Sequence, residues 1–268
     1  MNTSYWIITL KPESENVQEL QQALKSQGLE ANLFQAVDGR TAMPALEPGE
    51  KLAKHRTRLR HLCDLTPPEV GCYLSHLRLI KKAWNEGFES ICILEDDVKL
   101  EPDFARIMKE ITKLPSEVEM VRLMGLKIRK RKVVQPLGDG SHQLVRPERG
   151  WLGTQAYYLN RTGMEKVLKH ASTIKEPIDK MYDHFWEGGL RLFGVEPHLV
   201  YEANAAPSSI AKSNRQRAKV PWFYYLLHSL EKGIFSVTRH THLLMRRHEF
   251  YPATRPQKAP GQSARMRE

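Results

Sequence analysis

The sequence predicts an α/β protein whose mostly parallel, Rossmann-like sheet is flanked by helices. Short apolar runs of β-branched and aromatic residues, typical of buried strands, alternate with longer segments of helical periodicity. The first three segments are ordered strand, helix, strand, which favours a right-handed crossover and parallel pairing. A basic helical appendage is predicted at the C-terminal end.

The first predicted unit begins with "YWIITL" (5–10), which has the composition of a buried strand. Val17, Leu20 and Leu24 then recur at helical spacing, and Gly28 is suited to end that helix. "ANLFQAVDG" follows as a second strand closed by an Asp-Gly turn. We therefore expect a parallel strand pair joined by one helix.

A second helix is predicted to begin at Thr66, Pro67 and Pro68, because proline is favoured in the first helical turn. It leads into the buried strand "ICIL", which ends in acidic residues. The remaining elements expected are a helix near 103–113, the strand "EMVRLM", a hairpin-like region at 127–149, the strand "TQAYYLN", and helices near 161–170 and 177–187. No internal repeat is present in the sequence.

The C-terminal part of the chain differs in charge from the rest. From residue 212 to the end there are 12 Lys and Arg against 3 Asp and Glu, a net charge of +9, whereas residues 1–211 hold 29 against 28. This distribution favours an anionic surface as the partner of the tail over a nucleic-acid groove across the whole fold. We accordingly divide the chain into a body, residues 1–211, and a basic segment, residues 212–268.

Within that basic segment, "PWFYYLLHSLEKGIF" predicts an amphipathic helix. Its apolar face consists of Phe223, Leu226, Leu227, Leu230 and Ile234. Two interpretations stay open: an interfacial helix that binds an anionic membrane, or a helix packed against the body. The Pro-, Arg- and Gln-rich end of the chain is expected to be disordered.

The cysteines and the hydropathy indicate a cytoplasmic location. Cys63, Cys72 and Cys92 lie in or beside apolar segments without a CxxC pair, so we expect reduced, core-type thiols. The N-terminal residues lack the pattern of a secretory signal, and no run of about 18 apolar residues predicts a spanning helix.

Three consecutive carboxylates, Glu95, Asp96 and Asp97, follow the buried strand "ICIL". Like charges this close raise one another's pKa unless a cation or hydrogen bonds stabilise them. Because side chains alternate along an extended chain, Glu95 and Asp97 share one side and Asp96 takes the other. Two converging carboxylates suit Mg²⁺ or Mn²⁺ held with a diphosphate, although an acidic strand end exposed to solvent has the same composition.

Seven segments in order resemble glycosyltransferase family 25, the bacterial lipooligosaccharide galactosyltransferases and the related collagen galactosyltransferases. The segments are "ITL", "FQAVDGR", "LTPPEVGCYLSHLRLIKKAW", "ILEDDV", "GTQAYYLNRTGMEKVL", "PIDKMYDHFW" and "APSSI". The resemblance implies a GT-A-like fold for residues 1–211, a UDP-sugar donor, usually UDP-galactose, and Mn²⁺ or Mg²⁺ at a DxD-like motif. It also implies inversion at the anomeric carbon, and hence a β-linked product.

The resemblance places specific residues in the site. The metal ligands it implies are Glu95 and Asp97. Contacts with the donor are expected from Thr9, Leu10, Asp38, His76 and Asp96. Where the family often has Asn-Leu followed by arginines, this chain has Thr9-Leu10-Lys11-Pro12, so the nucleotide contacts there differ.

The catalytic base must be an acid other than the metal ligands, because it takes the proton from the acceptor hydroxyl on the face opposite the leaving group. Asp179 follows Pro177 near a predicted helix start, where the helix dipole favours an anion, although a helix-capping role explains it as well. Asp183, four residues on along the same helical face, is the alternative base.

The expected reaction is transfer of galactose to a lipid-linked lipooligosaccharide acceptor, by an enzyme bound peripherally to the inner face of the bacterial cytoplasmic membrane. Two other hypotheses remain. A nucleic-acid-binding protein or metal-dependent nuclease would account for the net charge of +10 but not for the nearly neutral body. An inactive family member would keep the fold without the reaction.

Overall fold

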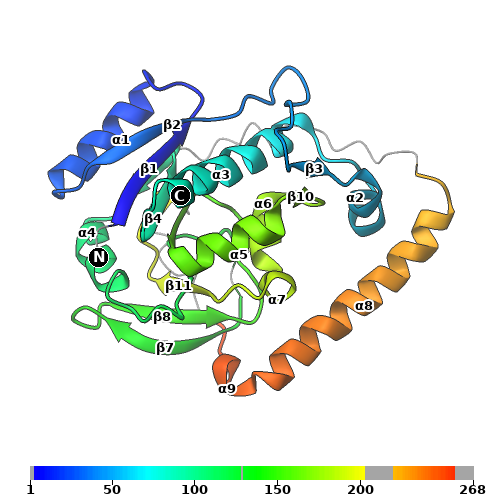
Figure 1. Ribbon diagram of the computed structural model, residues 1–268. Helices are drawn as coiled ribbons and strands as arrows, with labels where there is room; N and C mark the ends of the chain where they lie inside the picture. Colours follow the sequence, from blue (N-terminus) through cyan, green and yellow to red (C-terminus); the bar gives the residue numbers. More distant parts are fainter. Residues whose placement is uncertain (1–2, 128, 203–219, 257–268) are drawn as a thin grey trace, which may run out of the picture.

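The computed structural model describes residues 3–127, 129–202 and 220–256. Its centre is a sheet in the strand order β2-β1-β4-β9-β6-β11-β8-β7, with helices packed on both faces (Figure 1). The eight strands are β1 (Thr3–Thr9), β2 (Ala31–Gln35), β4 (Ser90–Glu95), β6 (Met120–Arg122), β7 (Arg131–Leu137), β8 (His142–Pro147), β9 (Ala156–Asn160) and β11 (Leu192–Glu196).

The strand directions confirm a mostly parallel sheet with two reversals. β1 is parallel to β2 and β4, and β6 is parallel to β11. β9 is antiparallel to both β4 and β6, and β8 is antiparallel to both β11 and β7. Six of the eight strands therefore point the same way, while β8 and β9 oppose them and make the sheet mixed. The expected α/β arrangement of a mostly parallel sheet between helices is confirmed.

The N-terminal strand–helix–strand unit forms as predicted. Helix α1 (Glu15–Ser26) buries Val17, Leu20 and Leu24, and Gly28 follows it with a φ of 75°, a left-handed conformation that glycine adopts readily. β1 then pairs with β2 on one side and with β4 on the other. Strand order reverses at β1, so a crevice is expected at the carboxyl ends of β1 and β4.

Helix α3 (Pro67–Asn85) leads into β4. Thr66 and Glu69 form a capping box at its start, which supplies partners for backbone groups that the first turn leaves free. Most of this helix is buried, including Leu74, Ser75 and His76. It lies beside α5 (Arg161–Ala171) on one face of the sheet (Figure 1).

The core has two layers, one on each face of the sheet, and alternation along the strands supplies both. On β4, Ile91 and Ile93 belong to the layer that contains α3 and α5, whereas Cys92 and Leu94 belong to the layer that contains α1 and α4 (Phe104–Ile111). Each buried strand therefore contributes to both layers, as expected for a three-layer α/β domain.

Several short elements were not predicted. The interior strand β11 is one of these, and its Gly194 lies against Trp151, so closely that a Cβ at Gly194 would meet the indole ring at 1.7 Å. Two small sheets, β3 (Lys51–Leu52) with β10 (Thr173–Ile174) and β5 (Val98–Leu100) with β12 (Val200–Glu202), flank the main one. Helix α2 (Lys54–His61) was not predicted either, whereas the helix expected near 177–187 is present as two short helices, α6 (Ile178–Asp183) and α7 (Phe185–Gly188).

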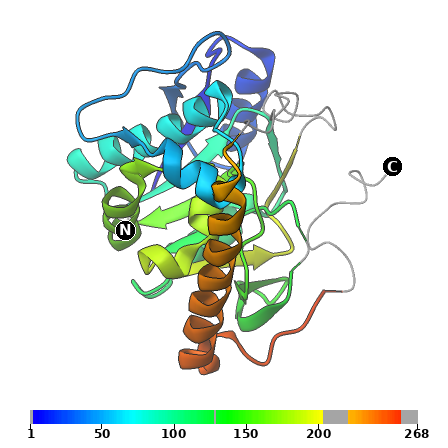
Figure 2. The same ribbon diagram turned by 90° about the vertical axis from the view of Figure 1, so that its right-hand side faces the viewer.

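The predicted C-terminal helix is present as α8 (Phe223–Met245), followed by the short α9 (Arg247–Phe250). α8 runs along the outside of the molecule and contacts α2 near one end, while α9 contacts β7 and β8 (Figures 1 and 2). No helix within residues 3–127, 129–202 and 220–256 has the length and apolarity needed to span a bilayer. The boundary at 211/212, the segment "APSSI" and the last twelve residues lie outside the described residues.

Candidate active site

Two cavities adjoin at the carboxyl ends of β1 and β4. The first has a volume of about 140 Å³, and its walls come from the end of β1, the loop after β2 and one side of α3. The second has a volume of about 200 Å³ and contains so many carboxylates that we call it the acidic cavity. Cys72 and Glu95 line both cavities, so these two residues mark the boundary between them.

The wall of the first cavity includes four of the five residues predicted to contact the donor: Thr9, Leu10, His76 and Asp96. Thr9 donates a hydrogen bond from Oγ1 to Asp96, and accepts one from the backbone N–H of Lys11 at 3.0 Å. Burial raises the pKa of Asp96, and the nearby charge of Glu95 raises it further, while the bond from Thr9 lowers it. Thr9 and Asp96 therefore form a polar, partly buried part of the cavity wall.

The loop after β2 reaches this cavity by close backbone packing on α3. A Cβ at Gly39 would lie 2.1 Å from the carbonyl oxygen of Pro67, and one at Gly71 would lie 2.7 Å from that of Val37. Ser75 on α3 accepts the backbone N–H of Val37 at 2.8 Å. Glycine at both positions therefore sets the width of the cavity.

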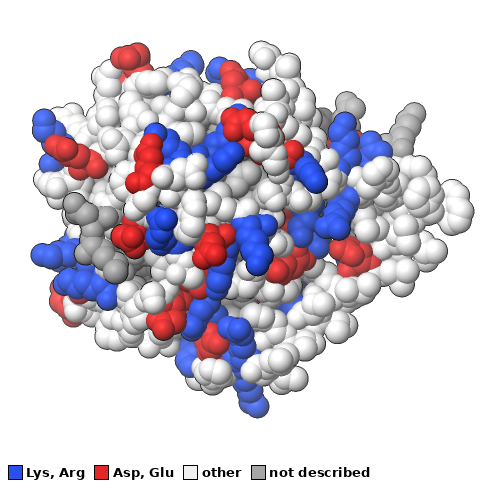
Figure 3. Space-filling model, viewed as in Figure 1, with Lys and Arg blue, Asp and Glu red and all other residues white. Residues whose placement is uncertain are grey.

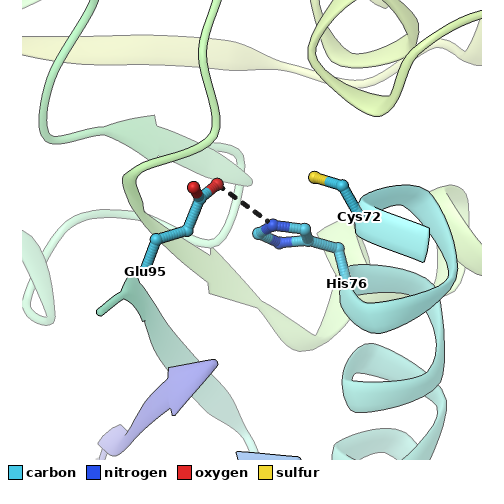
Figure 4. Close-up of side chains that lie close together, drawn as sticks. All are labelled: Cys72, His76 and Glu95. Atoms are coloured by element: carbon cyan, nitrogen blue, oxygen red, sulfur yellow. Dashed lines mark ion pairs between the residues drawn. The ribbon is translucent and has the colours of Figure 1, made fainter. Parts of the chain in front are cut away.

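Glu95 at the end of β4 is held from two sides. Thr154 donates to its Oε1 at 2.5 Å, and Nε2 of His76 lies 3.3 Å from the same oxygen (Figure 4). Burial raises the pKa of Glu95, but the contacts with His76, Thr154 and Arg122 outweigh burial and leave the pKa below its ordinary value. Glu95 is therefore stabilised as a carboxylate at the junction of the cavities.

His76 is fixed in turn by a buried chain of hydroxyls. Its Nδ1 lies 2.9 Å from the hydroxyl of Tyr157, which lies 3.0 Å from the hydroxyl of Tyr182. Cys72, one helical turn before His76, completes a group whose possible ligand atoms lie within 4.8 Å of one another. The three side chains of Cys72, His76 and Glu95 converge in Figure 4.

Asp97 has no comparable support. Its Oδ1 is buried without a hydrogen-bond partner among the described groups. Burial raises its pKa to about 7, with further contributions from the charges of Glu95, Asp96 and Glu202. A carboxylate in this setting is destabilised when it ionises, and a bound cation would reverse that effect.

Five carboxylates line the acidic cavity, and its described lining contains no Lys or Arg. The five are Glu69, Glu95, Asp97, Asp179 and Glu202. Asp179 begins α6, where it accepts the backbone N–H of Gly153 at 3.3 Å and that of Lys180 at 2.8 Å. These acids come from α3, β4 and the turn after it, α6 and β12, so only the folded chain brings them together.

Four consecutive residues before β9 each donate a hydrogen bond to a different acid. Leu152 and Gly153 use their backbone N–H groups, toward Asp183 at 2.8 Å and Asp179 at 3.3 Å. Thr154 and Gln155 use their side chains, toward Glu95 at 2.5 Å and Glu202 at 2.9 Å. Leu152 adopts a φ of 60°, rare for a non-glycine residue, to present its N–H. All four donors are uncharged, so they orient the carboxylates without offsetting their negative charge.

A sequence model of the family described as "Glycosyltransferase family 25 (LPS biosynthesis protein)" matches residues 2–182, more than half of the chain. The chain belongs to glycosyltransferase family 25. The match covers β1, α3, the acid triplet and Asp179, whereas Glu202 of the acidic cavity lies beyond it. Family membership predicted from the ordered motifs is therefore confirmed.

The matches with similar proteins cover only part of the length of those proteins. Procollagen galactosyltransferase 1 of Danio rerio is 25% identical over 217 residues, which are 73% of this chain and 35% of that protein. The "Probable inactive glycosyltransferase 25 family member 3" of Bos taurus is 29% identical over 177 residues, 59% of this chain and 29% of that protein. This family 25 chain thus spans about a third of the length of these relatives.

One solved structure similar to the chain is that of a glycosyltransferase involved in the glycosylation of the major capsid of PBCV-1. It aligns over 63% of this chain and 65% of that chain, with a TM-score of 0.32 and 10% sequence identity.

The positions of three residues in this family 25 site differ from what the sequence predicted. Asp38 does not line the first cavity; it holds Arg40, whose side chain does, through contacts of 2.6 to 3.2 Å. The Arg40 guanidinium lowers the pKa of Asp38 to about 2. Cys72, interpreted as a core thiol, lines both cavities, and burial raises its pKa. All three cysteines are free, as expected.

Asp183 lines neither cavity and lies behind their wall. It is buried, accepts the N–H of Leu152, and its Oδ1 lies 3.9 Å from Arg122. A Cβ at Gly150 would meet its carboxyl group at 1.8 Å, so the loop closes directly over it. Burial raises its pKa to about 6, against the lowering effect of Arg122. Of the two candidate bases, only Asp179 reaches a cavity.

The acidic cavity fits a divalent cation by its chemistry. Its donors are carboxylate oxygens, which Mg²⁺ and Mn²⁺ prefer, and the buried Oδ1 of Asp97 lacks any other partner among the described groups. Cys72, His76 and Glu95 form a softer donor set at the boundary, but His76 and Glu95 already engage each other there. Asp97 and Glu95 are thus the residues most suited to hold a hard cation.

Proposed function

We propose that this family 25 chain transfers galactose from UDP-galactose to a lipid-linked oligosaccharide of the lipooligosaccharide type, with inversion at the anomeric carbon. The observation that carries the proposal is the pairing of two cavities at Glu95, one lined by both apolar and polar groups and one rich in carboxylates. The procollagen galactosyltransferases among the relatives support galactose as the sugar. The family description supports a lipopolysaccharide-type acceptor.

The first cavity would take the nucleotide. Its lining combines the polar groups of Thr9 and Asp96 with the cation of Arg40, and Val37 and Leu10 add apolar surface. A base and ribose need this mixture of apolar surface and a few directed polar groups. Arg40 would attract the diphosphate, since guanidinium groups bind phosphate oxygens in bidentate fashion.

Asp97 and Glu95 would hold Mn²⁺ or Mg²⁺ at the junction. When bound, such a cation supplies positive charge that stabilises the departing diphosphate. His76 and Thr154 orient Glu95 through the contacts described, which keeps one carboxylate oxygen directed at the boundary. The chain thereby positions the leaving group next to the acidic cavity.

Asp179 would act as the base. Backbone N–H groups of Gly153 and Lys180 orient its carboxylate in the wall of the acidic cavity, where an acceptor hydroxyl can approach. The carboxylate takes the hydroxyl proton while the acceptor oxygen bonds to the anomeric carbon, and the bond from that carbon to the diphosphate breaks. Attack from the side opposite the leaving group inverts the configuration.

The proposal also includes the acceptor and the place where the enzyme meets it. A lipid-linked acceptor would present its sugars at the inner face of the bacterial cytoplasmic membrane, and the basic C-terminal segment, with its net charge of +9, would be drawn to anionic lipids there. A nucleic-acid site is disfavoured, because the excess positive charge lies in residues 212–268, whereas residues 1–211 hold 29 Lys and Arg against 28 Asp and Glu.

An inactive family member is the second candidate, because one relative bears that description in its name. Donor binding and hydrolysis should be measured with a panel of UDP-sugars, with and without Mn²⁺, on the unmodified chain and on Asp97→Ala. We expect Mn²⁺-dependent turnover of UDP-galactose that is lost in the variant. Binding without turnover in every condition would favour an inactive member, and no binding at all would contradict the proposal.

A further inference from the structure

Helix α8 is attached to the body by its polar side. Tyr224 places its hydroxyl 2.7 Å from Nδ1 of His55, and Nδ1 of His228 lies 2.8 Å from the carbonyl oxygen of Leu59. One turn further, Glu231 pairs with Arg60 at 3.2 Å. These contacts follow one side of the helix along α2 and set its rotation about its own axis.

Aromatic contacts continue the same attached side. Phe235 lies against His184 and Trp186, with ring centroids 4.5 and 5.1 Å apart, and the guanidinium of Arg60 lies over its ring at 5.0 Å. Beyond α8, Phe250 is fully buried beside Phe185. Both ends of α8 are therefore anchored, and the helix cannot turn its other side inward without breaking these contacts.

The outward side of α8 is apolar, the reverse of an ordinary surface helix. Its side chains are 43% to 71% exposed; they recur at helical spacing as far as Val237, and Leu244 follows two turns later, beyond Thr241, so that they span most of the 34 Å or so of the helix. We call this surface the α8 stripe: Phe223, Leu226, Leu227, Leu230, Ile234, Val237 and Leu244. Figure 2 shows α8 running along the front of the molecule. An apolar patch of this length on a soluble protein indicates a binding surface.

Charges around the stripe favour an anionic lipid surface as its occupant. The edge along which α8 runs is largely free of charged side chains in Figure 3. Exposed Trp222 precedes the stripe, and exposed Arg246 and Arg247 follow it. The two carboxylates of α8 and α9 are paired: Glu231 with Arg60, and Glu249 with Arg146 at 2.9 Å. Aromatic and cationic residues at the ends of an apolar stripe are typical of interfacial helices.

We propose that the α8 stripe lies in the headgroup–acyl boundary of an anionic membrane, with the helix axis parallel to the membrane plane. The proposal deepens the membrane location given above by naming the element and the face that bind. It rests on residues outside both cavities, so it stands or falls separately from the reaction.

Flotation of the full chain with vesicles tests this proposal. Vesicles of phosphatidylethanolamine and phosphatidylglycerol should carry the unmodified chain, and vesicles of phosphatidylcholine should carry less. Leu230→Glu with Ile234→Glu should lower binding to the anionic vesicles by about tenfold or more, because both side chains leave the apolar boundary. Gln18→Glu with Gln22→Glu on α1 makes the same change in charge elsewhere and should bind as the unmodified chain does.

Equal binding by the Leu230→Glu, Ile234→Glu variant and the α1 control would overturn the proposal. So would a chain that ignores vesicles but dimerises in sedimentation velocity and loses the dimer in that variant, because the stripe would then cover a second copy. Hydrolysis of UDP-galactose in solution should be equal in all three proteins. If the unmodified chain does not hydrolyse UDP-galactose, that result would count against the proposed reaction and leave the membrane result unaffected.

Discussion

Two regions of this molecule contain buried carboxylates, and the charges that surround those carboxylates are opposite in the two regions. In the acidic cavity, acids face acids, and burial together with those charges raises the pKa of Asp97 to about 7. Between α2, α6 and α7 lies a paired cluster of Glu176, Glu187, Arg60 and His184. There Glu176 is fully buried, yet contacts with Arg60 at 3.0 Å and His184 at 2.9 Å outweigh its burial and lower its pKa.

The comparison shows that the partner, and not the depth of burial, decides what a buried acid does. In the paired cluster the chain supplies its own cations, and the result is an attachment between elements distant in sequence. In the acidic cavity the chain supplies neutral donors such as Thr154 and Gln155, and its described lining contains no Lys or Arg, so a bound cation would supply the missing positive charge. The paired cluster stabilises the fold, whereas the acidic cavity is suited to bind a cation.

Asp97→Asn should produce the largest change. We expect transferase activity to fall by about a hundredfold to a thousandfold, because the leaving group would lose the bound cation. At about a hundred times its Kd, Mn²⁺ should stabilise the unmodified chain by about 3 kcal/mol and raise its Tm, and the variant should lose this shift. Without metal the variant should be at least as stable, because Asn removes the repulsion among the acids.

Asp139→Asn is the matched control for that experiment, because Asp139 is an exposed acid paired with Arg106 at 3.0 Å. It should leave both the activity and the Mn²⁺ shift unchanged. An Asp97→Asn protein that still gains stability from Mn²⁺ would place the cation elsewhere.

Asp179→Asn and Asp183→Asn separate the two candidate bases. Asp179→Asn should lower kcat by about a hundredfold or more, and Asp183→Asn by less than about tenfold, because only Asp179 lines a cavity. Single-turnover kinetics with saturating donor measures both. The opposite ranking would identify Asp183 as the base and would require the loop around Leu152 to move during the reaction.

Glu176→Gln should act on stability and not on activity. Removing one partner of a buried charge cluster leaves Arg60, His61 and His184 less well paired, at an expected loss of about 3 kcal/mol in the free energy of unfolding. Urea denaturation measures this loss. Glu110→Gln breaks an exposed pair with Lys113 and should cost less than about 0.5 kcal/mol. Equal losses in the two variants would show that the cluster does not stabilise the fold.

The stability of the chain should carry a pH dependence from Asp183. Its folded pKa of about 6 lies above the ordinary value of 3.8, so the folded state binds the proton more tightly than the unfolded state. That contribution is fully present below about pH 3.8 and is lost as pH rises through about 6.

Asp183→Asn should therefore flatten the stability profile between pH 4 and pH 7, by no more than about 3 kcal/mol. Unfolding in urea at several pH values checks this, with Glu110→Gln as a variant that should keep the original slope. Parallel profiles for the unmodified chain and Asp183→Asn would contradict the burial effect.

Thr154→Val should have the smallest effect. Without the hydroxyl, Glu95 keeps His76 but loses the donor at 2.5 Å, and we expect kcat to fall by about tenfold through poorer positioning. Thr154→Ser keeps the hydroxyl and should restore most of the activity. A Val variant as active as the unmodified chain would show that the hydrogen bond to Glu95 does not matter, and a Ser variant as impaired as the Val variant would show that the methyl group is needed as well.

Local patterns in the sequence were sufficient for much of this account. Alternation in "ICIL" and the helical spacing of Val17, Leu20 and Leu24 predicted β4 and α1, because both periods are set by the backbone geometry of one element. The capping residues Thr66 and Glu69 lie three positions apart and are equally local. Strand β11 was missed because its five residues show no clear alternation and its pairing partners, β6 and β8, lie far away in the chain.

Contacts between distant segments decided the rest. The acid triplet was visible in the sequence, but its neighbours Glu202 and Cys72 are brought there only by β12 and α3. The apolar stripe of α8 was visible too, but its direction depended on polar contacts with α2, which turn the stripe outward. Periodicity records which residues share a face, whereas the sum of packing and ion pairs across the fold determines what that face meets.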